Sequence, residues 1–320
     1  MKNKSQLTDF YYKSLYPILK KLDEDRKNLQ YRIVLIISFF SLIYGVLFFY
    51  ILGETDGGGN ALLFGGVGYV AIVRFIYKFS IKDYTAEFKN TIIRPLITAI
   101  EPNLSYSADR HIPEHLFNRS ELFARPDKLT GNDFVKGIID GVPLQFSDLH
   151  AQKRHEDSKG NVSWSTVFKG LFIVAEFNKH FKSKTIILPD SAQSMFGDFI
   201  GSWLQANNFS QDSLVKMDNV EFEKEFVVYG DNQVEARYIL SHTLMQKLLV
   251  LKKRSKHKVY ISFVGENINI VIDYDKDLFE PTVFKSLLEY NVAMEYVDTL
   301  HMAIGIVKEL KLNEKLWSKE

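Results

Sequence analysis

The run YRIVLIISFFSLIYGVLFFYIL, residues 31–52, constrains this chain more than any other stretch. It carries one charge, Arg32 at its edge, and it matches the roughly 20 apolar residues that a helix needs to cross hydrocarbon. A polar segment, residues 1–30, precedes it and no small-residue cleavage site follows, which is not typical of a cleaved signal peptide. The sequence therefore predicts a membrane-spanning helix.

A second apolar run, ALLFGGVGYVAIVRFIYKF at residues 61–79, is predicted as a second span although Arg74 interrupts it. An arginine close to a helix end can extend its guanidinium to the lipid headgroups. Gly65, Gly66 and Gly68 would give this helix a smooth face for close packing against the first. Residues 31–79 are thus predicted to form a transmembrane hairpin.

The flanking charges predict the orientation of this hairpin. Basic residues precede the first span (Lys13, Lys20, Lys21, Arg26, Lys27 and Arg32) and follow the second (Lys78, Lys82 and Lys89). The connecting loop, GETDGGGN at residues 53–60, carries only Glu54 and Asp56, and it lacks the Gly-Lys-Ser/Thr ending of a phosphate-binding loop. By the positive-inside rule both termini are cytoplasmic, and the glycine loop is a turn on the outer side.

Residues 83–320 are predicted to form one cytoplasmic domain. Apolar residues recur at helical spacing from 83 to about 100, which predicts a connector helix. Pro95 lies inside this segment and favours a kink or a break in the helix. Downstream, we expect a short helix at 113–123, tight hairpins at Asp140-Gly141 and at 265–267, and a strand over 221–230. One helix over 235–254 and another from 281 to 310 complete the pattern. Strands in the middle with helices around them predict an α+β fold on a mainly antiparallel sheet.

Composition excludes several kinds of function. Lys plus Arg, 40 residues, nearly balances Asp plus Glu, 39 residues, so nothing in the net charge indicates nucleic-acid binding. The chain has no cysteine, which excludes disulfides, thiolate metal ligands and a cysteine nucleophile. The pattern HIPEH at residues 111–115 has the spacing of one zinc-peptidase motif, but Pro113 opposes a continuous helix through His111. We therefore predict no metal site and no cofactor.

Several short motifs resemble a known family. They are SELF (120–123), GNDFVKG (131–137), FKGLFIVAEFNK (168–179), LPD (188–190), VEFEKEFVVYGDNQVEARYIL (220–240) and VYISF (259–263). Over roughly Glu114 to Leu310 the chain resembles a bacterial group, domain-of-unknown-function family 3137. The resemblance implies a membrane-anchored bacterial protein and supplies no activity, so no catalytic residue is carried over. Together with the predicted topology, it places the large domain on the cytoplasmic side of the inner membrane.

Two segments are candidate contact sites. Lys252, Lys253, Arg254, Lys256 and Lys258 form a basic helix end, which either is simply solvated or contacts anionic lipid headgroups at about 1 kcal/mol per cation.

The second segment is a strand-to-helix turn with Asp231, Asn232, Glu235 and Arg237. We interpret it as a helix cap in which Glu235 reaches back to its own first turn, with an anion-binding turn as the alternative.

The sequence favours a membrane-anchored cytoplasmic binding or scaffold module that holds a protein partner or a lipid surface. One alternative is a hydrolase with a histidine and carboxylate site, which would involve His111, His115 or His150. Another alternative is an accessory subunit of a transporter, in which Arg74 contacts another membrane chain.

Overall fold

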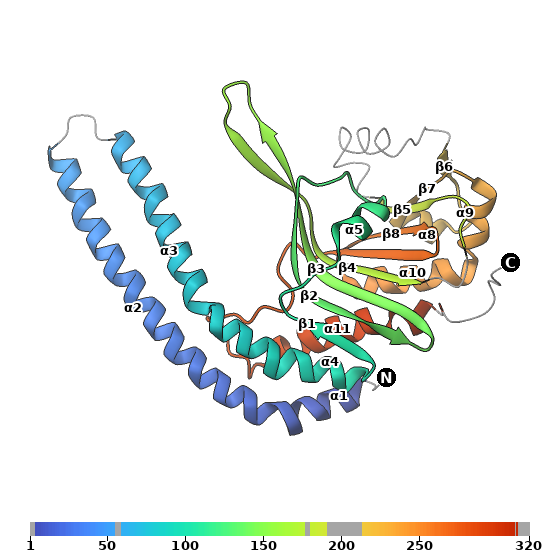
Figure 1. Cartoon of the computed structure of the whole chain (residues 1–320), viewed down its shortest axis with the longest axis horizontal. Coiled ribbons are helices and arrows are strands. Elements are labelled where there is room, and N and C mark those ends of the chain that lie inside the picture. The colour runs from blue at the N-terminus through green and yellow to red at the C-terminus, as the bar shows by residue number, and fades with distance from the viewer. Residues whose placement is uncertain (1–3, 55–58, 177–179, 191–212, 311, 313–320) are drawn as a thin grey trace. The chain divides into compact units, whose positions relative to one another are not determined.

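A computed structural model describes residues 4–54, 59–176, 180–190, 213–310 and 312 (Figure 1). The glycine loop lies largely outside the described residues. Contacts divide the chain into two units. The helical unit comprises Asn3–Leu96 and Phe279–Asp298, and the sheet unit comprises Ile97–Leu278 and Thr299–Glu320. The domain limits inferred from the sequence stay predictions, but the grouping of Phe279–Asp298 with the N-terminal helices was not foreseen.

The helical unit is built from a few continuous helical segments. They are α1 (Lys4–Phe10), the π-helical turn η1 (Tyr11–Leu15), α2 (Tyr16–Glu54), α3 (Gly59–Phe88), the π-helical turn η2 (Lys89–Ile93) and the start of α4 (Arg94–Ile100). The predicted break near Pro95 is η2, which lies just before it. A π-helical turn locally rearranges the hydrogen-bond ladder, and the connector continues beyond it as α4.

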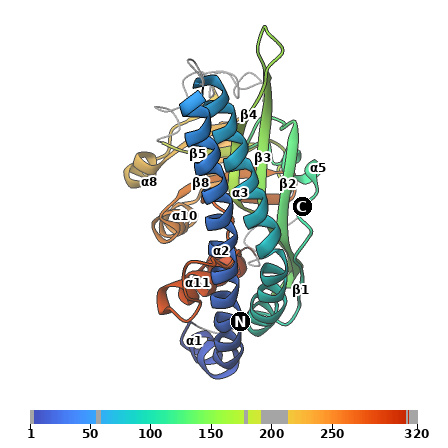
Figure 2. The same ribbon diagram turned by 90° about the vertical axis from the view of Figure 1, so that its left-hand side faces the viewer.

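Helices α2 and α3 lie side by side (Figures 1 and 2). The ring of Tyr44 stacks on Tyr69 with centroids 4.9 Å apart, and the Ser41 and Tyr69 hydroxyls are hydrogen-bonded. A Cβ on Gly66 would lie 3.3 Å from the Tyr44 hydroxyl, whereas one on Gly68 would meet nothing within 4 Å. A Cβ on Gly65 would lie 3.6 Å from a ring carbon of Tyr44. The predicted close packing is therefore confirmed for Gly65 and Gly66 and wrong for Gly68.

One helical stretch among the described residues, Thr8–Leu52, is long and apolar enough to cross a membrane, judged by length and composition alone. It starts well before residue 31 because the polar residues ahead of the apolar run are helical too. Arg26 is buried there, and its guanidinium donates to Asp23 Oδ1 at 2.7 Å and to the Val283 carbonyl at 2.8 Å. Residues 16–30 thus pack against a C-terminal segment of the same unit and are not a free tail.

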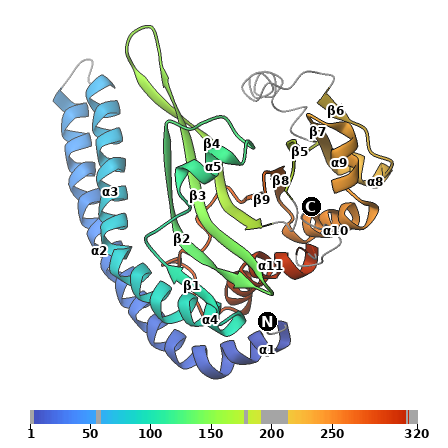
Figure 3. The same cartoon turned by 45° about the vertical axis from the view of Figure 1, so that its right-hand side comes forward.

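The sheet unit contains one nine-stranded sheet, in the order β1-β2-β3-β4-β9-β8-β5-β7-β6, with every neighbouring pair antiparallel (Figure 3). The strands are β1 (Leu104–Ser107), β2 (Lys128–Ile139), β3 (Val142–Glu156), β4 (Val162–Glu176), β5 (Thr185–Pro189), β6 (Leu214–Val215), β7 (Phe226–Gly230), β8 (Lys258–Val264) and β9 (Asn267–Asp273). The α+β prediction is confirmed. Both predicted hairpins, β2–β3 and β8–β9, are present.

Helices lie on both sides of this sheet (Figure 2). They are α5 (Glu114–Arg119), α8 (Val220–Glu225), α9 (Gln233–Ile239), α10 (His242–Ser255) and the C-terminal half of α11 (Tyr290–Leu310). On one side, the segment around α5 packs Phe117 and Phe123 against Phe172 and Tyr260. We call this side the α5 face, and α10 lies on the opposite side.

Three sequence predictions of secondary structure were wrong in part. The strand predicted over 221–230 begins as helix α8, because the Asn219 side chain caps it by accepting from Phe222 N. The helix predicted over 235–254 is two helices, since Ser241 accepts from Leu244 N and starts α10 anew. The last helix begins at Tyr290, because residues 281–289 form turns that are part of the helical unit.

Candidate functional site

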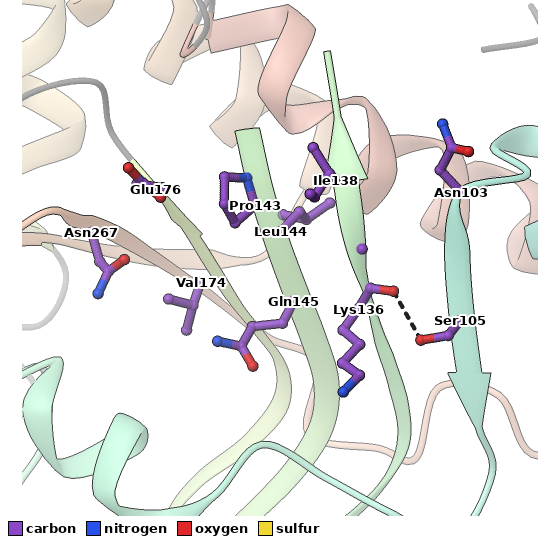
Figure 4. Close-up of a pocket in the computed structure, with 11 residues that line it drawn as sticks. Asn103, Ser105, Lys136, Ile138, Pro143, Leu144, Gln145, Val174, Glu176 and Asn267 are labelled. Atoms are coloured by element: carbon purple, nitrogen blue, oxygen red, sulfur yellow. Dashed lines mark hydrogen bonds between the residues drawn. The ribbon is translucent and has the colours of Figure 1, made fainter. Parts of the chain in front are cut away.

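The α5 face is left open at one end, where it forms a hollow of about 430 Å³ (Figure 4). Its lining comes from β1, β2, β3, β4 and β9 and from the residue before β1. The residues are Asn103, Ser105, Lys136, Gly137, Ile138, Pro143, Leu144, Gln145, Val174, Glu176 and Asn267. They come from five adjacent strands, so the hollow is a feature of the sheet surface itself.

Cross-strand register explains why these side chains converge. Ser105 is paired with Lys136, Lys136 with Gln145, and Gln145 with Val174, so one row of side chains crosses four strands on the same face. A second row, two residues along, contains the pairs Ile138–Pro143 and Glu176–Asn267.

Glycine lets β1 approach the floor of the hollow. A Cβ on Gly137 would lie 2.3 Å from the Asn103 carbonyl oxygen, a distance that no side chain tolerates. The Ser105 hydroxyl donates to the Lys136 carbonyl at 3.0 Å and holds the edge strand in place.

The hollow is chemically mixed. Ile138 is 57% exposed beside Pro143, which gives an apolar patch in the middle. Lys136 and Glu176 provide one charge of each sign, and the amides of Asn103, Gln145 and Asn267 can both donate and accept. A second hollow of about 530 Å³ shares Lys136 and Gln145 and extends toward His111 and Phe134. Such a surface fits a ligand that has amide groups and small apolar side chains.

A smaller cavity of about 210 Å³ surrounds Asp148 on the other side of the sheet. Asp148 is 3% exposed; its Oδ2 accepts from Leu278 N at 2.8 Å, while its Oδ1 has no hydrogen-bond partner among the described residues. Burial raises the pKa of Asp148 to about 7, and the nearby carboxylates of Asp277 and Asp133 add to the shift.

His150 lines the same cavity two residues along β3. Burial and the charge of Lys169 lower the pKa of this histidine, and its Nε2 lies 2.9 Å from the Thr166 hydroxyl. The sequence analysis named His150 but missed Asp148. No local signal marks Asp148, because residues 146–149 are all buried and its hydrogen-bond donor, Leu278 N, lies 130 positions away.

The turn at residues 231–237 is a cap in the structure. The Asn232 side chain accepts from Val234 N and Glu235 N, at 3.0 and 3.1 Å. The Glu235 carboxylate, which the sequence analysis placed in the first turn of its own helix, accepts from Lys182 N at 3.1 Å and from Ser183 N at 2.8 Å in the loop before β5.

The remaining two residues of the turn have backbone contacts. Arg237 Nε donates to the Lys216 carbonyl at 3.3 Å, and the backbone N–H of Asp231 donates to the Lys184 carbonyl. The ligand role for this turn stays a prediction, and its described contacts are structural.

The five cations of the basic segment have different surroundings. Lys252 donates to the His257 carbonyl at 2.8 Å, and Arg254 forms an ion pair with Glu309 and lies 3.1 Å from His301 Nδ1. Lys253 and Lys256 are exposed, while Lys258 is half-buried at the start of β8. Lipid contact by this segment stays a prediction.

The HIPEH pattern does not form a helical motif. Helix α5 starts at Glu114, with Pro113 extended as its N-cap residue, so His111 precedes the helix, as the proline indicates. In the part of the chain that the structure describes, no group of three or more His, Asp or Glu side chains could hold a metal ion.

Comparisons with known proteins give little functional information. No curated protein matches the chain. Among solved structures, the crystal structure of the mycobacterial trehalose monomycolate transport factor A, TtfA, is similar over 67% of this chain and 93% of that chain. The identity is 9% and the TM-score is 0.33, which is too low to support an argument.

A family model matches residues 166–312, which run from within β4 to just beyond the end of α11. The match starts later than the Glu114 estimated from sequence motifs. The resemblance predicted from those motifs is confirmed: this part of the chain is similar to the family described as "Protein of unknown function (DUF3137)".

Proposed function

We propose that this protein is a membrane-anchored binding module, and that the hollow on the α5 face receives an extended segment of a protein partner. The hollow is the observation that carries this proposal. Its amides can pair with peptide groups, and its patch at Ile138 and Pro143 can take an apolar side chain.

A protein partner suits the chemistry better than a lipid surface. Lys136 and Glu176 present opposite charges in the hollow, and an anionic headgroup would be repelled by the second. In the basic segment, Arg254 already pairs with Glu309 and Lys252 with a backbone carbonyl. Two of its five cations therefore already have protein partners.

The anchor would be α2, with α3 as the second span of the predicted hairpin and the sheet unit in the cytoplasm. This topology is supported by the length and apolar composition of the first helical stretch and by the flanking charges. Because the chain has no cysteine, a single Ser158→Cys substitution at the exposed β3–β4 turn gives a clean reporter. A membrane-impermeant thiol reagent should label it only after the cells are opened. Labelling of intact spheroplasts would exclude the cytoplasmic orientation.

A photo-crosslinking amino acid at Ile138 tests the hollow in native membranes. We expect one discrete adduct, which should weaken at least about tenfold when Gln145→Arg fills the neighbouring space. The same photo-crosslinker at Val250, an exposed position on α10, serves as the control and should not form that adduct. Equal adducts from both positions, or none from Ile138, would count against the hollow as the site.

The cavity at Asp148 makes acid–base catalysis a second candidate. A buried carboxyl whose pKa lies near neutrality and an imidazole share its lining, as in many sites of proton transfer. A screen of hydrolase substrates against the full chain, repeated with Asp148→Asn and His150→Gln, tests it. Turnover that both substitutions abolish without loss of folding would favour the enzyme; turnover that neither changes would remove these residues from consideration.

A further inference from the structure

The β3–β4 hairpin extends beyond the strands on either side of it and forms a two-stranded arm (Figures 1 and 3). β2 pairs with β3 only up to Gln152, and β9 pairs with β4 only from Gly170 onward. The arm itself remains paired to its end, at Glu156 and Val162. Each arm strand therefore has one edge that no strand of the sheet covers.

The two edges of the arm differ in protection. On the β3 side, Asp127 accepts from Arg154 N at 2.8 Å and donates its own N–H to the Gln152 carbonyl. That edge also carries Lys153, Arg154 and Glu156, and charged edge residues prevent strand addition. Asp127 thus occupies backbone groups that an incoming strand would need.

The β4 edge has none of these features. Residues 162–168 read VSWSTVF, without a charge or a proline, and residues 162–166 are all exposed. Among the described residues, no backbone hydrogen bond reaches this edge before Lys169, whose carbonyl accepts from Asp275 N. Val162 and Trp164, 47% and 46% exposed, lie on one side of the arm. This is a strand edge suited to pairing.

We propose that this edge pairs with the same edge of a second copy of the chain, antiparallel and about a two-fold axis. An antiparallel contact between identical strands is self-complementary and closed, so it yields a dimer and not a fibre. Because residues 162–168 are uncharged, no like charges of this strand meet across the axis. Val162 and Trp164 of both copies lie side by side, with Lys128 Nζ 6.0 Å from the centre of the Trp164 ring.

The contact is small, well below the roughly 1,200 Å² of a stable soluble dimer, so the dimer is weak in dilute solution. Attachment of both copies to one membrane raises their effective concentration and offsets this weakness. The inference goes beyond the proposed hollow, because the arm and the hollow use different residues and can fail separately.

A cysteine scan of the natural cysteine-free chain tests the pairing. Single cysteines at positions 162 to 166 of the full chain, in membranes under mild oxidation, should give one position that crosslinks to itself at least about tenfold faster than Ser158→Cys. That position is on the axis, and the rate should fall for positions two residues away. Equal rates at all positions, as in non-specific aggregation, or no crosslinking at any, would overturn the proposal.

Matched charge variants separate edge pairing from a general effect of the arm. Ser163→Lys places a cation on the β4 edge, and Ser158→Lys places the same charge at the turn; both positions are exposed. Combined with the on-axis cysteine, Ser163→Lys should reduce crosslinking at least about tenfold and Ser158→Lys should leave it unchanged. Equal loss in both variants, or loss in neither, would contradict the edge as the contact.

Discussion

The helical unit and the sheet unit distribute their side chains in opposite ways. In the sheet unit the large apolar side chains lie inside, as Phe172 and Ile270 do with no measurable exposure. In the helical unit, α2 and α3 expose theirs: Leu42, Phe49 and Phe75 are 68%, 75% and 70% exposed, while Arg26 is 6% exposed. This contrast is the one that the proposed anchor requires, because side chains that face hydrocarbon can stay apolar at the surface of a protein whereas those that face water are mostly polar.

The two units also differ in the pKa of a buried aspartate, Asp23 in the helical unit and Asp148 in the sheet unit. Burial alone would raise the pKa of Asp23, yet hydrogen bonds from Arg26 and Ser286 and the charge of Arg26 hold that pKa below its usual range. Asp148 has a similar solvent exposure but lies deeper within the protein. Leu278 N is its one hydrogen-bond donor among the described residues, and its pKa rises. The depth of burial and the partners together decide whether a buried carboxyl stays ionised.

The test with the largest expected effect replaces one phenylalanine in each unit by alanine. Phe172→Ala, in the core of the sheet unit, should lower the free energy of unfolding by about 4 kcal/mol. Phe39→Ala, at a side chain that is 61% exposed on α2, should change it by less than about 0.5 kcal/mol in detergent. Denaturation of the solubilised protein measures both. Similar losses would mean that Phe39 is covered by protein, and the proposed lipid-facing surface would be wrong there.

The second test removes the buried cation of the helical unit. Arg26→Met removes the buried cation beside Asp23 and the donor to the Val283 carbonyl, which should cost about 3 kcal/mol. The released segment should then be cut faster by trypsin after the exposed Lys285.

Lys27→Ala is the matched control for this test. Lys27 also lies near Asp23, at 3.4 Å, but its side chain is 65% exposed, so the loss should stay below about 0.5 kcal/mol. If the two variants were cut at the same rate, the buried pair would not hold the segment.

The third test concerns pH. In the unfolded chain an aspartate titrates near 3.9, whereas the pKa of Asp148 is about 7 in the folded protein. The folded state therefore holds a proton between these values that the unfolded state has lost, and this group's contribution to stability falls as pH rises from about 4 to 7.

Asp148→Asn keeps an acceptor for Leu278 N and cannot ionise. It should stabilise the protein by about 4 kcal/mol at pH 8, and the gain should vanish toward pH 4. Thermal melting of both proteins at several pH values measures this. A gain that does not vary with pH would mean that Asp148 does not titrate in this range.

Local patterns predicted the elements whose partners are near in sequence. The turns at Asp140-Gly141 and Gly265 need a positive φ, observed at 50°, 85° and 64°, and residues of these types indicate such turns directly. The apolar run of α2 was evident because hydrocarbon selects composition alone. Antiparallel pairing of consecutive strands also follows from short connections.

The elements and sites that were missed depend on distant residues. The turns at residues 281–289 exist because Ser286 and the Val283 carbonyl bond to Asp23 and Arg26, more than 250 positions away. The hollow likewise needs the register between β1 and β2, which brings Ser105 beside Lys136. No local periodicity encodes such pairings, so neither could be inferred from one sequence.

The test with the smallest expected effect concerns Glu235, which the sequence analysis and the structure place in different contacts. The sequence placed Glu235 in its own helix cap, but its carboxylate accepts from Lys182 N, Ser183 N and the Ser183 hydroxyl. Glu235→Gln retains one acceptor oxygen and turns an N–H₂ group toward a donor, which should cost about 1 kcal/mol. Hydrogen exchange at the Ser183 amide should then accelerate about fivefold, since this amide loses its acceptor.

Glu221→Gln, at an exposed position on α8, makes the same change in charge and should leave that amide unaffected. If both variants accelerated exchange equally, net charge and not this contact would set the opening of the loop.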